Sequence, residues 1–105
     1  MLYLVRMDQD RLYMFEMTGK FLSYMEVGDY ENAKQAILQL HKRAENVYAE
    51  NINIKNIREK YGNMNEKEKT ELNNLITEYK AHIDESKKLF KIVNIPQLNL
   101  EGKTQ

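Results

Sequence analysis

Chain-breaking residues are sparse in this sequence, and their positions constrain the fold more than any other feature. The strong breaks fall at Gly28, Gly62 and Pro96, with neither glycine nor proline between residues 29 and 61. Between the breaks, apolar residues recur at spacings of three and four, the period of an amphipathic α-helix. The alternation typical of a strand is not sustained anywhere in the chain. The sequence therefore predicts an all-α protein.

The first two helices are expected on either side of Gly28. The first runs from about residue 8 to residue 27, with Asp8 or Asp10 as its N-cap, because an aspartate oxygen accepts hydrogen bonds from free backbone N–H groups. The second begins at Asp29 and can continue without interruption to Tyr61. A break within residues 50–56 (ENINIKN) is the alternative, since asparagine and β-branched isoleucine are weaker helix formers.

The third helix is bounded by signals at both ends. Asn65 and Glu68 have the spacing of a capping box, and Pro96 ends the helical region. The short connections between the three segments imply antiparallel neighbours. We predict an up-down bundle of three helices, or four if the second divides, or an elongated helical hairpin. Residues 1–95 form this single domain, and residues 96–105 are expected to be a flexible tail.

Composition excludes several classes of protein. Sixteen basic and sixteen acidic residues cancel, so no net positive charge attracts nucleic acid. The apolar run at the N-terminus spans only Leu2 to Val5, whereas a signal-peptide core needs about 7–15 residues and a membrane helix about 20. No cysteine is present, so there is no disulfide framework. We expect a soluble cytoplasmic protein with no nucleic-acid partner and no membrane insertion.

Residues that carry chemistry are few. His41 and His82 fall on different predicted helices beside apolar positions, without the His-x-x-x-His or Glu-x-x-His spacing of a metal site. The acidic residues belong to solvated helical faces, and no glycine-rich phosphate loop occurs. We therefore expect the histidines at the edge of the core, and we expect no enzymatic activity, no metal and no cofactor.

The first predicted helix is the exception, because apolar residues cover more of it than one buried face needs. They form two neighbouring stripes, Met14, Met17, Phe21 and Tyr24 in one and Leu12, Phe15, Leu22 and Met25 in the other. Methionine is flexible and frequent on surfaces that accommodate a partner. One interpretation is that this helix is simply buried by the other two. The functional interpretation is a partner-binding surface of Met14, Met17, Phe21, Tyr24 and Met25.

Gly19 lies in the middle of the same helix. A glycine there costs about 1 kcal/mol relative to alanine. That cost is tolerable where another helix approaches closely.

Residues 28–33 (GDYENA) are similar to a phrase of tetratricopeptide repeats, but they occur once and no 34-residue period follows. The chain as a whole resembles flagellar export chaperones of the FliT type and, less closely, FlgN. The matching stretches are Phe15 to Met25, Gly28–Asp29, LQLHKRAENV with Leu40 and Arg43, and LNNLITEYKAHID. The likeness covers about residues 8–93.

This resemblance implies a cytoplasmic chaperone that binds the C-terminal helical segment of the filament-cap protein before export. Recognition is then helix-in-groove, with an amphipathic client helix on the apolar face of the bundle. In that family the last helix can cover the client site, a role that Leu89, Phe90 and Val93 can have here. Two other functions remain open: a small regulator or inhibitor of one target protein, of the phage or plasmid type, and a structural homodimer without a client.

Overall fold

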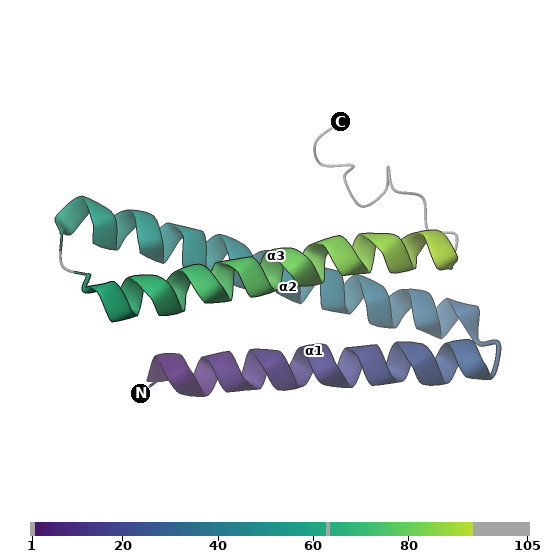
Figure 1. Cartoon of the computed structure of the whole chain (residues 1–105). Coiled ribbons are helices and arrows are strands. Elements are labelled where there is room, and N and C mark those ends of the chain that lie inside the picture. The colour runs from purple at the N-terminus through teal and green to yellow at the C-terminus, as the bar shows by residue number, and fades with distance from the viewer. Residues whose placement is uncertain (1, 63, 94–105) are drawn as a thin grey trace.

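The computed structural model describes residues 2–62 and 64–93, with side chains from residue 9 onward. This part of the chain forms three helices, α1 (Leu2–Glu26), α2 (Tyr30–Tyr61) and α3 (Glu66–Ile92), and contains no strand. α1 and α3 run in one direction and α2 runs in the opposite direction (Figure 1). The prediction of an all-α antiparallel bundle is confirmed. The predicted tail, residues 96–105, lies outside the described residues.

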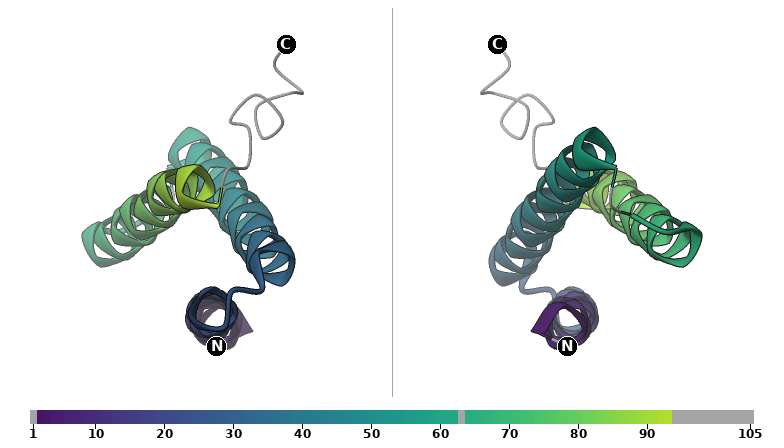
Figure 2. Two further views of the ribbon diagram at one scale, coloured as in Figure 1. Left: turned by 90° about the vertical axis from the view of Figure 1, so that its right-hand side faces the viewer. Right: turned by 90° about the vertical axis from the view of Figure 1, so that its left-hand side faces the viewer.

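The second helix is the centre of the fold. α2 packs against both α1 and α3, whereas within the described ranges α1 and α3 meet only through side chains. Viewed end-on, α2 and α3 cross each other and α1 lies along one edge (Figure 2). One side of α1 therefore faces the other two helices, and neither of them covers its opposite side.

Two clusters of buried side chains form the core. The middle cluster joins all three helices halfway along the bundle and consists of Met14, Met17, Leu40, Ala44, Val47, Leu75, Tyr79 and Ile83. The corner cluster lies where α1 turns into α2 and where α3 ends, and it consists of Phe21, Ala33, Ala36, Ile37, Phe90 and Val93. Burial of these apolar side chains is the main favourable contribution to folding.

The first helix begins earlier than the sequence predicts. α1 starts at Leu2, so Asp8 and Asp10 lie inside the helix and neither caps it. No glycine or proline precedes them to break the chain, and leucine, arginine and methionine favour helix. Asp10 instead accepts a 2.7 Å hydrogen bond from the Arg43 guanidinium of α2.

The second helix is continuous, which resolves the alternative of a break within residues 50–56. Asn51 is buried inside it, and its side-chain amide donates a 2.7 Å hydrogen bond to the Val47 carbonyl one turn earlier. That bond satisfies the polar group that makes asparagine costly in a buried position. α2 therefore accommodates Asn51 without interruption.

Both ends of the α1–α2 turn, the end of α2 and the start of α3 agree with the predicted signals, whereas Pro96 lies outside the described residues. Gly62 closes α2 in the left-handed conformation, with φ of 66°. The capping box of α3 is complete, since Asn65 accepts from the Glu68 N–H at 2.8 Å and the Glu68 carboxylate accepts from the Asn65 N–H at 3.2 Å. Gly28, with φ of 77°, makes the turn between α1 and α2.

Asp29 is the N-cap of α2, and its removal should destabilise the protein measurably. Its carboxylate accepts hydrogen bonds from the Asn32 backbone N–H at 3.3 Å and from the Asn32 side chain at 2.7 Å. We expect Asp29→Ala to lower the free energy of unfolding by about 0.5–2 kcal/mol in urea denaturation. Asp29→Asn keeps an acceptor oxygen and should lose less; equal stability of Asp29→Ala and the wild type would contradict the capping role.

Candidate functional site at the corner of the bundle

The C-terminal end of α3 lies on the corner formed by α1 and α2. Phe90 and Val93 from α3 pack in the corner cluster with Phe21 from α1 and with Ala33 and Ile37 from α2. Tyr24, Met25 and Leu89 are half-buried and pack against the same cluster. The structure thus brings together three residues of the predicted partner-binding set and all three residues predicted to cover a client site.

The predicted partner-binding residues do not form one open surface. Met14, Met17 and Phe21 are buried, with 2%, 5% and 3% of their surface exposed, whereas Tyr24 and Met25 are half-buried. Met14 and Met17 belong to the middle cluster under Leu75, Tyr79 and Ile83 of α3. For this stripe, the simpler interpretation that the helix is buried by its neighbours holds in the folded conformation.

Exposed apolar side chains are also found at this end of the molecule. Val27 is 76% exposed in the α1–α2 turn, Tyr30 is 56% exposed in the first turn of α2, and Ile92 is 60% exposed at the end of α3. We call these three residues the corner patch. The periodicity of the sequence does not indicate these residues, because each stands at a helix end, outside the apolar stripes. The only sequence feature that these residues share is a position close to a chain break, Gly28 for Val27 and Tyr30 and Pro96 for Ile92.

A buried hydrogen bond joins the C-terminal part of α3 to α2. The Nδ1 atom of His41 lies 2.7 Å from the Ser86 hydroxyl oxygen, and its Nε2 atom lies 3.2 Å from the Glu45 carboxylate. The His41 ring also meets the Phe90 ring edge to face, with centroids 5.3 Å apart. His41 is 5% exposed, so the prediction that it lies at the core edge is wrong. Ser86, which supplies its partner, is 45 residues away in sequence.

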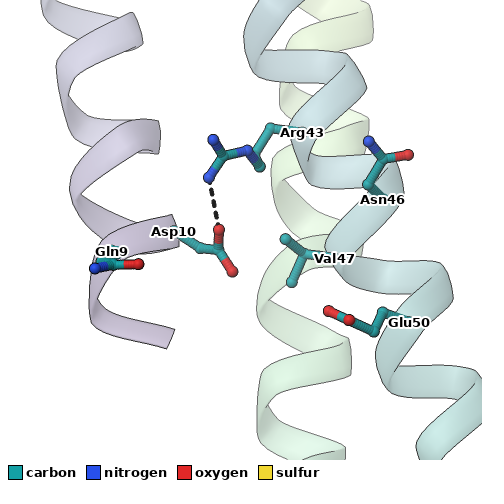
Figure 3. Close-up of a pocket in the computed structure, with 6 residues that line it drawn as sticks. All are labelled: Gln9, Asp10, Arg43, Asn46, Val47 and Glu50. Carbon is teal, nitrogen blue, oxygen red and sulfur yellow. Dashed lines mark hydrogen bonds and ion pairs between the residues drawn. The ribbon is translucent and has the colours of Figure 1, made fainter. Parts of the chain in front are cut away.

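A concave region lies between α1 and α2, away from the corner. Its volume is about 420 Å³, and it is lined by Gln9, Asp10, Arg43, Asn46, Val47 and Glu50. Figure 3 shows the Arg43 guanidinium directed at the Asp10 carboxylate across the gap between the helices. Arg43 also lies over the Tyr13 ring, 4.0 Å from its centroid. These contacts join α1 to α2, so we assign the region a structural role.

The Tyr79 hydroxyl is the one buried side-chain polar atom without a hydrogen-bond partner among the described residues. Burial in the middle cluster, together with the charges of Glu78 and Asp10, raises the pKa of Tyr79 from 10.0 to about 12. Burial disfavours the phenolate because the charged form loses its hydration.

This shift predicts a loss of stability at high pH. Below pH 10 the tyrosine is neutral in both the folded and the unfolded states, and its contribution is fully present. Between pH 10 and about 12 the unfolded chain ionises first, so the free energy of unfolding should fall by about 2 kcal/mol. Urea denaturation across this range measures the loss. Tyr79→Phe should lose less over the same range, and an identical profile in this variant would contradict the assignment.

Among the described residues, no three His, Asp or Glu side chains lie together as they would to hold a metal ion. None of the described helices has the length and apolar character needed to cross a membrane. Comparison of the chain with protein-family models, with curated proteins and with solved structures gave no match.

Proposed function

We propose that this protein is a cytoplasmic chaperone or adaptor that binds an amphipathic helical segment of another protein at the corner of the bundle. The supporting observation is the packing of the last turn of α3, with Phe90 and Val93, over Phe21 of α1. A helix end that fills an apolar corner can be replaced by a client helix of similar chemistry.

The position of the covering residues favours such an exchange. Leu89, Phe90 and Val93 lie in the last turn of α3 and at its C-cap, where a helix lacks the hydrogen bonds of its interior. Helix ends open locally at a lower free energy than the core does. The middle cluster holds the rest of α3 to α1 and α2, so release of the last turns leaves the bundle assembled.

The corner also indicates the chemistry of the client. When the last turns of α3 are released, the surface of the corner consists of Phe21, Tyr24 and Met25 from α1 with Ala33 and Ile37 from α2. Small alanines beside a phenylalanine and a methionine accept large aliphatic or aromatic side chains, and methionine adapts to different shapes. Val27 and Tyr30, which are exposed at the same end of the molecule, add apolar side chains that stay in place when the end of α3 is released.

The flagellar assignment rests on the resemblance to FliT-type export chaperones. It proposes the C-terminal helical segment of the filament-cap protein as the client, held before type III export. Leu40 and Arg43 belong to a stretch that resembles FliT-type chaperones. Leu40 is buried in the middle cluster, and Arg43 pairs with Asp10 of α1. Both residues stabilise the packing of the helices that form the corner.

Calorimetric titration with a peptide from the C-terminal segment of a filament-cap protein tests the proposal. We expect saturable one-to-one binding, weakened about tenfold or more by Met25→Ser, because Met25 packs against the corner cluster. Ile57→Ser is the matched control, since Ile57 is exposed on the last turns of α2, away from the corner. A scrambled peptide of the same composition controls for non-specific apolar binding.

Three results would contradict the proposal. They are no binding by the wild type, equal binding of the scrambled peptide, and equal weakening by Ile57→Ser and Met25→Ser. Binding of another helical peptide but not of the cap-protein segment would keep the helix-binding function and reject the flagellar client.

A further inference from the structure

A second apolar surface lies on α1, on the side turned away from the rest of the chain. Leu12, Phe15 and Leu22 are 56%, 76% and 60% exposed, although all three are large apolar side chains. With Gly19 they occupy positions i, i+3, i+7 and i+10, which form one face of a helix. We call these four residues the outer stripe. The buried residues Met14, Met17 and Phe21 lie on the opposite face of the same helix.

Gly19 is the unusual member of the outer stripe. It is exposed, and no atom of another element would lie within 4 Å of a Cβ placed on it. The fold of the single chain therefore gives no reason for a glycine, although glycine costs about 1 kcal/mol inside a helix relative to alanine. A surface glycine between exposed apolar residues allows another helix to approach closely.

We propose that the outer stripe is an interface between two copies of this chain, with their α1 helices antiparallel across a two-fold axis. Placing the axis midway between Phe15 and Gly19 sets Phe15 of each copy on Gly19 of the other. The same register sets Leu12 of each copy against Leu22 of the other. Each large side chain thus meets a glycine or another leucine, and the surface is self-complementary, as a two-fold interface requires.

The charges beside the outer stripe fit the same arrangement. Glu16 and Lys20 are exposed and border the stripe on one side. In this register Glu16 of each copy and Lys20 of the other lie on the same side of the contact, offset by two residues or about 3 Å along the helix axes, and so within reach of each other. Two reciprocal attractive pairs then flank the apolar contact. Exposed pairs of this kind contribute little affinity but select the orientation of the helices.

The position of α1 leaves room for a second copy. α1 lies along one edge of the molecule, with α2 on one side of it, and among the described residues no helix lies on its far side (Figures 1 and 2). Residues 12–22 span about 15 Å of helix axis, which is short for a protein interface. We therefore expect a weak, reversible dimer with a Kd of about 10 µM to 1 mM.

Sedimentation equilibrium of the whole chain from 10 µM to about 1 mM tests the proposal. The wild type should dimerise, and Gly19→Gln should raise the Kd about tenfold or more, because its side chain fills the space for Phe15 of the second copy. Glutamine favours helix more than glycine does, so this variant should not unfold. Ile57→Ser, exposed on α2 outside the interface, should leave the Kd unchanged.

The charge pairs give an independent test of orientation. E16K alone should raise the Kd about threefold or more at low salt, and the double variant E16K/K20E should restore the wild-type value. Three results would overturn the proposal: a monomer at about 1 mM, a Kd unaffected by Gly19→Gln, or a double variant weaker than E16K. Because the outer stripe faces away from the corner, Gly19→Gln should bind the cap-protein peptide as the wild type does, so this inference and the proposed function can fail separately.

Discussion

Replacing Phe90 with alanine should lower the free energy of unfolding by about 3–5 kcal/mol. Phe90 is fully buried, packs in the corner cluster and meets the ring of His41. Its removal takes away the largest covering side chain and leaves a cavity at the junction of the three helices. Urea denaturation measures the change. For a small domain, this is a large part of the total stability.

The same substitution should strengthen client binding. If the last turns of α3 cover the binding surface, Phe90→Ala removes a competitor and should lower the Kd for the cap-protein peptide severalfold. Ile83→Ala is the matched control, because Ile83 lies on α3 but belongs to the middle cluster. It should lose stability without a gain in affinity. Equal or weaker peptide binding by a folded Phe90→Ala variant would count against the covering role.

Tyr79 provides the second large effect, and two substitutions separate its ring from its hydroxyl. Tyr79 is fully buried in the middle cluster, so Tyr79→Ala should lower the free energy of unfolding by about 3–5 kcal/mol. Tyr79→Phe removes only a hydroxyl without a hydrogen-bond partner among the described residues. It should therefore be as stable as the wild type or more stable by up to about 1 kcal/mol.

The comparison of the two variants also tests the environment of the hydroxyl. A loss of more than about 1 kcal/mol in Tyr79→Phe at neutral pH would mean that the hydroxyl makes a stabilising hydrogen bond in solution. Denaturation of both variants at pH 7 is sufficient, because the Tyr79 pKa of about 12 keeps the folded-state hydroxyl neutral there.

Local signals in the sequence predicted the helix boundaries because each acts within a few residues. Asp29, Asn65 and Glu68 bond to backbone groups three positions away, and Gly62 takes a conformation that few other residues adopt. The start of α1 differs from the prediction, because Asp8 and Asp10 have the side chain of an N-cap but lie inside the helix. Neither acts as a cap, since the helix already extends past them to Leu2.

Long-range packing decides the features that the sequence left open. Both stripes of α1 are apolar, and composition alone does not determine which one faces inward. In the structure the ion pairs Asp10–Arg43 and Arg11–Glu78 attach α1 to α2 and α3, and the stripe of Met14 and Met17 lies on the inner side. Burial of His41 likewise depends on Ser86 of α3, which no local pattern indicates.

Hydrogen exchange of the backbone amides, with and without the cap-protein peptide, measures whether a client displaces the end of α3 from the corner. We expect residues 89–93 to exchange faster than residues 72–83 in the free protein. On peptide binding, protection should rise at Phe21, Tyr24 and Met25 and fall further at residues 89–93, because the client takes the place of the last turn of α3. Unchanged or increased protection of residues 89–93 in the complex would contradict the account.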